Sequence, residues 1–176
     1  MSQKYKCCDT EFENLNDFKR HIRSRNWHRL NYSDLIRLKM KNETLYNIIR
    51  NPNILFALSN LITPIQDKGI LYLPFTKQRT GLVLKRSIVG KLEGPKPDID
   101  LIKYKFTSDN IVYELGFRVK KINEEYSELL VLCSMNVNIG LLGRLLPSEV
   151  LKTLQKMVTP QIVVEKVSKN LSAISV

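Results

Sequence analysis

Polar and apolar residues alternate along much of the chain, which is the pattern of half-exposed β-strands. The alternation begins at Asp34, where Ile36, Leu38 and Met40 share one face and basic residues share the other. Short turn-forming sequences such as DKG, EGPKPD and NEEY separate the later strands. Those strands are expected at 61–66, 70–75, 82–90, 99–107, 111–122 and 128–139. The sequence therefore predicts a seven-stranded antiparallel sheet, with strands long enough to require strong twist and curvature.

Helical periodicity replaces this alternation in two regions. Two short helices are predicted after the first strand, one capped by Asn42 and one beginning at Pro52, a residue that suits the first helical position. Apolar residues then recur every three or four positions from Pro147 to about Leu171, which predicts a long C-terminal helix. Pro160 should kink this helix, because proline removes one backbone hydrogen bond. A long helix across a curved sheet leaves gaps, so we expect a cavity between them.

The order of these elements resembles the helix-grip fold of the START, polyketide-cyclase and pollen-allergen superfamily (SRPBCC), an α+β fold. The resemblance is clearest in LYNIIRNPNILFALSNLITPIQDKG, residues 45–69, which looks like the two short helices of that family around its usual Asp-Pro pair. Asn51 stands where the family usually has Asp. The body is most similar to small archaeal members that are associated with carrying fatty acids. This resemblance implies a carrier for a fatty acid or similar hydrophobic molecule.

The first 30 residues have a different pattern, which is typical of a small zinc finger. Counted from Cys8, aromatic residues stand at the fourth and tenth positions and His21 at the thirteenth, as in two-Cys, two-His fingers. The usual spacer between the cysteines is missing, however, and six residues separate His21 from His28. An unbroken helix would place the two histidines about 10 Å apart. The helix must therefore break near Asn26 if both are to bind one ion.

We expect a structural zinc ion at this module, and its predicted ligands are Cys7, Cys8, His21 and His28. A site with only three of these ligands, and a metal-free finger held by its aromatic residues, are the alternatives. The long histidine spacing is similar to that of matrin- and JAZ-type fingers, which contact double-stranded RNA. The chain is then expected to divide into a finger-like module at 1–31 and a helix-grip ligand-binding domain at 32–176.

The net charge of +11 would suit an acidic surface or a nucleic acid. Residues 1–30 carry seven basic and four acidic side chains, so most of the excess charge lies outside the finger. Nucleic-acid binding is therefore the alternative function, as is a ligand-sensing regulator that uses both parts. No apolar run approaches the roughly 20 residues of a membrane helix, and we expect a cytoplasmic protein that does not span a membrane. The candidate phosphate contacts are Lys19, Arg20, Arg23 and Arg25.

Inward-facing positions of the strands and of the C-terminal helix are the candidate ligand contacts, although they also suit an ordinary core. Arg86 lies in phase with Leu84, and an inward arginine would need an anionic partner such as a carboxylate headgroup, whereas a local bulge would turn it outward. Outside the finger the chain has no histidine and no glycine-rich phosphate loop, so we expect no enzymatic activity. The candidate ligand contacts are Leu84, Arg86, Tyr104, Phe106, Tyr113, Leu115, Phe117, Met135, Leu154, Met157 and Val158.

Overall fold

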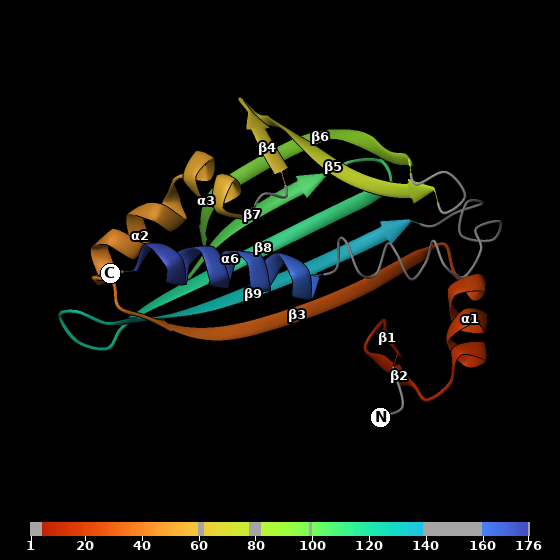
Figure 1. The fold of residues 1–176 in the computed structure, drawn as a ribbon, viewed down its shortest axis with the longest axis horizontal. Coiled ribbons are helices and arrows are strands. Elements are labelled where there is room, and N and C mark those ends of the chain that lie inside the picture. The colour runs from red at the N-terminus through yellow and green to blue at the C-terminus, as the bar shows by residue number, and fades with distance from the viewer. Residues whose placement is uncertain (1–4, 60–61, 78–81, 99, 139–159, 176) are drawn as a thin grey trace.

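Figure 1 shows the computed structural model of the protein, which describes residues 5–59, 62–77, 82–98, 100–138 and 160–175. Its centre is a seven-stranded antiparallel sheet with the strand order β3-β9-β8-β7-β6-β5-β4. Consecutive strands from β4 to β9 are neighbours. β3 lies beside β9 at one edge of the sheet. The predicted seven-stranded meander is therefore confirmed. The strands are β3 (Trp27–Leu38), β4 (Ile62–Ile65), β5 (Lys68–Lys77), β6 (Leu82–Asp98), β7 (Leu101–Thr107), β8 (Ile111–Lys121) and β9 (Ser127–Asn138).

β3 begins earlier than the sequence pattern indicates. It was expected from Asp34, but it starts at Trp27 and pairs with β9 along its whole length, from Trp27 opposite Asn138 to Leu38 opposite Ser127. The sequence pattern does not indicate the first half of the strand, because its first inward position is His28 rather than an apolar residue. β3 thus runs without interruption across residues 31 and 32, between which the sequence analysis divides the chain into two parts.

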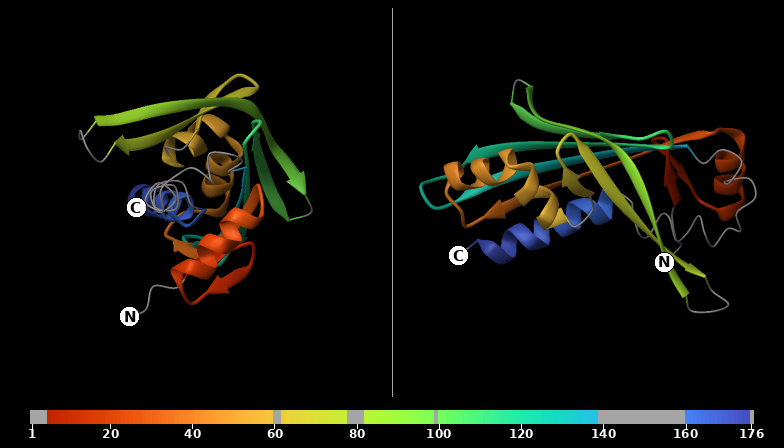
Figure 2. Two further views of the ribbon diagram at one scale, coloured as in Figure 1. Left: turned by 90° about the vertical axis from the view of Figure 1, so that its right-hand side faces the viewer. Right: turned by 90° about the horizontal axis from the view of Figure 1, so that it is seen from above.

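β6 is 17 residues long and bends sharply on its way across the sheet. Its first part pairs with β5 and its last part with β7, with a register shift between Glu93 and Lys96. Gly94, at the shift, has a φ of +120°, and a Cβ there would lie 2.6 Å from the carbonyl oxygen of Lys103. The EGPKPD segment is therefore a bulge inside a strand rather than the predicted turn, and it turns β5 and β6 away from the plane of β7–β9 (Figure 2).

One face of the sheet, here called the inner face, is apolar and packs against three helices (Figures 1 and 2). These are α2 (Asn42–Arg50), α3 (Pro52–Ser59) and α6 (Pro160–Ile174). The two predicted short helices are confirmed, although Asn42 is the first residue of α2 and not its cap. The helices bury Leu45, Ile49, Leu55, Phe56, Val163, Val164, Val167 and Leu171 against the sheet.

The predicted C-terminal helix is seen only in its second half. The described helix α6 begins at Pro160, whereas residues 147–159, and with them the expected kink, lie outside the described residues. The opposite, outer face of the sheet carries the polar positions of the same strands. Within the described part of the chain, no helix is both long enough and apolar enough to cross a membrane.

The N-terminal module consists of β1 (Tyr5–Cys7), β2 (Thr10–Phe12) and α1 (Leu15–Ser24), which lie beside the start of β3 (Figure 1). Asn14 caps α1, because its side-chain oxygen accepts a hydrogen bond from the backbone N–H of Asp17 at 2.9 Å. Since α1 ends at Ser24 and β3 begins at Trp27, the predicted break of the helix near Asn26 is confirmed.

Candidate functional site

Four potential metal ligands meet where the N-terminal module joins β3. The sulfur atoms of Cys7 and Cys8 lie 3.7 Å apart, and Cys7 Sγ lies 3.5 Å from His28 Nδ1. In a tetrahedral site, bonds of about 2.3 Å to sulfur and 2.0 Å to nitrogen place the ligand atoms about 3.3 to 3.8 Å apart. These two distances are therefore those of ligands on one ion. The atoms that lie within 4.8 Å of one another belong to Cys7, Cys8, His21 and His28.

A left-handed turn allows the adjacent cysteines to reach the same point. Cys8 and Asp9 have φ angles of +53° and +61°, a region that residues other than glycine rarely adopt. The turn is held to β3, because the backbone N–H of Cys8 donates to the carbonyl oxygen of Arg29 at 2.8 Å. The N–H of Arg29 points back at Cys8 Sγ at 3.4 Å, where it would stabilise a thiolate. This turn takes the place of the spacer that ordinary fingers have between their cysteines.

Each histidine has one ring nitrogen that could bind a metal. His28 Nε2 lies 3.2 Å from the carbonyl oxygen of Ile22 and 3.1 Å from that of Arg25. Because carbonyl oxygens only accept, Nε2 carries the hydrogen and Nδ1 is the nitrogen that faces the sulfurs. His21 Nε2 is buried and has no hydrogen-bond partner among the described residues. His28 Nδ1 and His21 Nε2 are therefore the nitrogens that could bind a metal.

Burial keeps the histidines and Cys7 neutral in the absence of an ion. It lowers the pKa of His21 and of His28, and the positive charge of Arg25 adds to both effects. Burial also raises the pKa of Cys7, helped by the neighbouring Cys8. A neutral imidazole is the form that binds metal, and a bound cation would displace the thiol protons. The donor set and its spacing therefore fit a metal ion.

The strand positions predicted to face inward do so on β7, β8 and β9. Tyr104 is held most firmly, because its hydroxyl donates to the carbonyl oxygen of Ile49 at 2.7 Å and its ring packs edge-on against Phe56 and Phe117. Burial raises the pKa of Tyr104 and of Tyr113, so both hydroxyls keep their protons. The buried members of the predicted set are Tyr104, Phe106, Tyr113, Leu115, Phe117 and Met135, none more than 5% exposed.

The other predicted ligand contacts fall where the side chains are not described. Leu84 and Arg86 lie in β6, opposite Phe75 and Leu73 of β5. Leu154, Met157 and Val158 lie outside the described residues. The role of Arg86 as a partner for a carboxylate stays a prediction, as does the expected cavity between the sheet and the C-terminal helix.

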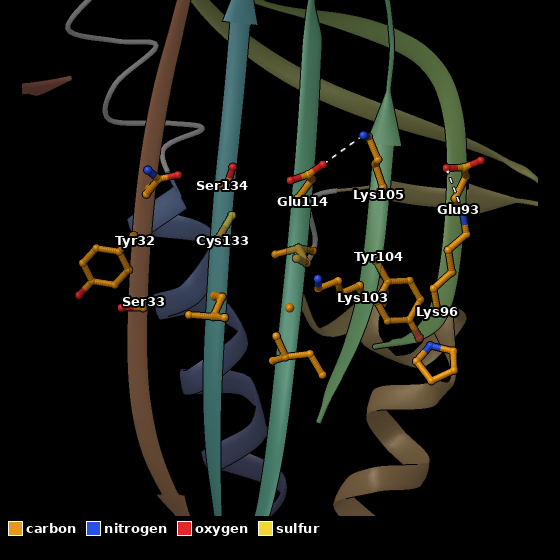
Figure 3. Close-up of a pocket in the computed structure, with 16 residues that line it drawn as sticks. Tyr32, Ser33, Glu93, Lys96, Lys103, Tyr104, Lys105, Glu114, Cys133 and Ser134 are labelled. Carbon is orange, nitrogen blue, oxygen red and sulfur yellow. Dashed lines mark hydrogen bonds and ion pairs between the residues drawn. The ribbon is translucent and has the colours of Figure 1, made fainter. Parts of the chain in front are cut away.

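A hollow that was not predicted lies on the outer face of the sheet. It has a volume of about 920 Å³ and crosses β3, β9, β8, β7 and β6 (Figure 3). Gly116 forms part of its floor, where an added Cβ would be 3.6 Å from Leu132. Its rim is charged, and Lys105 pairs with Glu114 at 3.1 Å. Outward strand positions resemble any solvated surface in a sequence, so only the curvature of the folded sheet reveals this hollow.

No protein-family model matches the sequence, and no curated protein matches it. Solved structures match in fold, however. Zhui aromatase/cyclase from Streptomyces sp. R1128 is 11% identical with a TM-score of 0.52, over 84% of this chain and 94% of that chain. Truncated norcoclaurine synthase from Thalictrum flavum is 11% identical with a TM-score of 0.51, over 83% and 92%. A START superfamily protein from Mycobacterium smegmatis is 15% identical with a TM-score of 0.49, over 83% and 97%.

These matches identify the fold as the helix-grip fold that the sequence resembles. They also correct one expectation. The aromatase/cyclase and the norcoclaurine synthase are enzymes with this fold, so the fold gives no ground for excluding an enzyme. The expectation of no enzymatic activity rested on the lack of histidines and of a phosphate-binding loop outside the finger. Only some kinds of catalysis require those groups.

Proposed function

We propose that the protein binds a hydrophobic small molecule, a fatty acid or similar lipid-like compound, against the inner face of its sheet. The helix-grip fold supports this proposal, and one observation carries it. The apolar inner face extends to the end of the sheet where β3 begins, and Leu30, Tyr32 and Val137 are only partly buried there although they pack against the core. Apolar surface with room for further contacts is what a hydrocarbon chain requires.

The buried aromatic and apolar residues next to this surface supply most of the proposed contacts. Met135 and Tyr113 lie side by side on β9 and β8, and Leu30 pairs with Met135 on the other side. Burying about eight CH₂ groups would contribute about 6 kcal/mol before the ordering of the ligand is counted. Arg86 is the proposed partner of an acidic headgroup. Leu84, Leu154, Met157 and Val158 complete the proposed set.

Extraction of the purified protein and mass spectrometry test this proposal. We expect a hydrophobic compound that survives purification and that an added fluorescent fatty acid displaces. A matched pair of variants locates the site, since Val137 faces inward while Val112, on the adjacent strand, faces outward. Val137→Glu should abolish binding and Val112→Glu should preserve it. A protein that carries no guest and binds no fatty acid would refute the proposal, and a chemically altered guest would reveal a reaction.

We also propose that the ion of the N-terminal module is zinc and that its role is structural. Two sulfur and two nitrogen donors within 4.8 Å of one another favour Zn²⁺, and four protein ligands leave no position for a substrate. Thiolate ligands also agree with a reducing cytoplasm, where we place the protein. Metal analysis should find about one zinc per chain in the wild type and none in Cys8→Ser. Unchanged zinc content in that variant would remove Cys8 from the ligand set.

Nucleic-acid binding is the second candidate function, because α1 and the residue after it present a basic surface. Arg20, Arg23 and Arg25 are exposed and Lys19 is partly so, while Asp17 pairs with Arg20 at 3.5 Å. Charge reversal of Arg23 and Arg25 should then weaken retention of double-stranded RNA, and salt should weaken it steeply in the wild type. Retention that neither salt nor these substitutions change would argue against this function.

A further inference from the structure

The metal ligands and the proposed ligand site share one strand. His28 is the second residue of β3, and its partner across the strand pair is Val137 of β9. Leu30 and Tyr32 follow at alternate positions, so they lie on the same side of the strand as His28. The residue that would hold the ion is therefore built into the sheet that forms the proposed ligand site.

Leu30 continues this link through side-chain packing. It contacts the small cluster of the N-terminal module, which consists of Cys7, Phe18 and Ile22, and it also contacts the main core. Its strand partner is Met135, one of the proposed ligand contacts. Among the described residues, Leu30 is thus the side chain that packs against both hydrophobic clusters, two residues away from the proposed ligand His28.

The cysteine turn also covers the free edge of β3. β3 is the outermost strand of the sheet, and no other described strand of the sheet lies along its edge away from β9. Cys8 N–H donates to Arg29 at this edge, and the side-chain amide of Asn31 donates to the carboxylate of Asp9 at 3.1 Å. An edge strand held on one side only opens more easily than a central one. The turn that carries both thiols therefore holds β3 from its second side.

We propose that occupancy of the metal site regulates the ligand site through β3. The ion fixes the first residues of β3 against β9, and its loss releases the end of the sheet that carries Leu30 and Tyr32. Metal binding stabilises only conformations in which all four ligands are in place, so its free energy is available to this strand pair. Regulation of ligand binding rests on the proposed binding of a hydrophobic molecule, whereas the hold of the ion on β3 rests only on the proposed metal site.

Unfolding experiments test the hold on β3 without any ligand. Trp27, the only tryptophan, precedes His28 and reports on the metal site by fluorescence, while far-UV circular dichroism reports on the sheet. We expect the two probes to unfold together, and chelation to lower both midpoints by the same amount. His21→Asn should act in the same way, because it removes a ligand from α1 and leaves β3 intact. A change in the Trp27 signal alone, with an unaltered midpoint for the sheet, would overturn the proposal.

Ligand titrations test the regulation. We expect a fluorescent fatty acid to bind about tenfold more weakly to chelated protein and to His21→Asn than to zinc-loaded protein, a factor usual for coupled sites. Coupling is reciprocal, so saturating fatty acid should hinder removal of zinc by a chelator to the same extent. Equal affinity in the loaded and chelated forms would overturn the regulation. Lack of binding in every form would instead refute the proposed function, and the unfolding result would still decide whether the ion holds β3.

Discussion

Cys7 Sγ and His28 Nδ1 face each other at 3.5 Å, although 21 positions separate them in the chain. The opposite nitrogen of the ring, Nε2, fixes this orientation, since it contacts two carbonyl oxygens at the end of α1. The strand thus brings one ligand to the site and the cysteine turn brings two, and a metal would join them. The accessibility of Cys7 and Cys8 follows from this arrangement, whereas that of Cys133 follows from its burial in β9.

Thiol titration should distinguish the cysteines of the module from Cys133. In zinc-loaded protein we expect slow reaction of every thiol, and after chelation we expect Cys8, which is partly exposed, to react first. Cys133 should react only on unfolding, because burial raises its pKa to about 12. Its reactive thiolate is then only about one part in ten thousand at pH 8. Rapid modification of Cys133 in folded protein, checked against Cys133→Ser, would contradict this.

Two glycines of the sheet should respond differently to the same substitution. A Cβ at Gly90 would lie 2.5 Å from the carbonyl oxygen of Thr107 and 2.6 Å from the ring of Phe106, so backbone and core must both move. Gly90→Ala should therefore lower the free energy of unfolding by about 2 kcal/mol. At Gly116 the nearest atom would be 3.6 Å away, which is an ordinary contact. Denaturant unfolding of both variants checks this, and equal stability of the two would show that β6 yields at Gly90.

The fold was largely readable from the sequence because strands such as β7, β8 and β9 bury alternate residues. Alternation alone gave the meander, and Pro52 marked the start of α3. Two segments were misread because their residues obey local rules that tertiary structure overrides. Gly94 and its neighbours look like a turn but form a bulge, and the first half of β3 has a histidine at an inward position.

The candidate site was readable only in part. Residue type and spacing predicted a cluster of Cys7, Cys8, His21 and His28, and the structure places their potential ligand atoms within 4.8 Å of one another. The turn that brings Cys7 and Cys8 together could not be predicted from the sequence. Cys8 and Asp9 both have a positive φ, but neither is a glycine, the residue that usually indicates such a conformation. The outer hollow depends on how far the sheet curves, which side-chain patterns along single strands do not encode.

Removal of one hydroxyl should loosen α2 from the sheet. The Tyr104 hydroxyl donates to Ile49 O at the end of α2, in a buried setting. Tyr104→Phe leaves that carbonyl without this donor, and we expect the free energy of unfolding to fall by about 1 to 2 kcal/mol. Tyr46→Phe is the matched control, because Tyr46 lies on the same helix and is 39% exposed. Equal effects of the two substitutions in urea unfolding would show that the buried bond contributes little.

Alkaline pH should unfold the protein through two tyrosines of the inner face. Burial raises the pKa of both Tyr104 and Tyr113 above the ordinary value near 10, and the neighbouring Cys133, once ionised, would raise that of Tyr113 further. Folding therefore favours the protonated hydroxyls. Their contribution to stability is complete below about pH 10 and decreases above it by up to about 1.4 kcal/mol per pH unit for each tyrosine.

Tyrosinate absorbance and far-UV circular dichroism, followed in one alkaline titration, check this expectation. Part of the absorbance should appear only as the dichroism is lost, because the buried hydroxyls ionise on unfolding. Tyr104→Phe and Tyr113→Phe should each reduce the amplitude of that late step, whereas Tyr46→Phe should leave it unchanged. Complete ionisation of every tyrosine while the sheet signal persists would contradict this expectation, because Tyr104 and Tyr113 are buried in the folded protein.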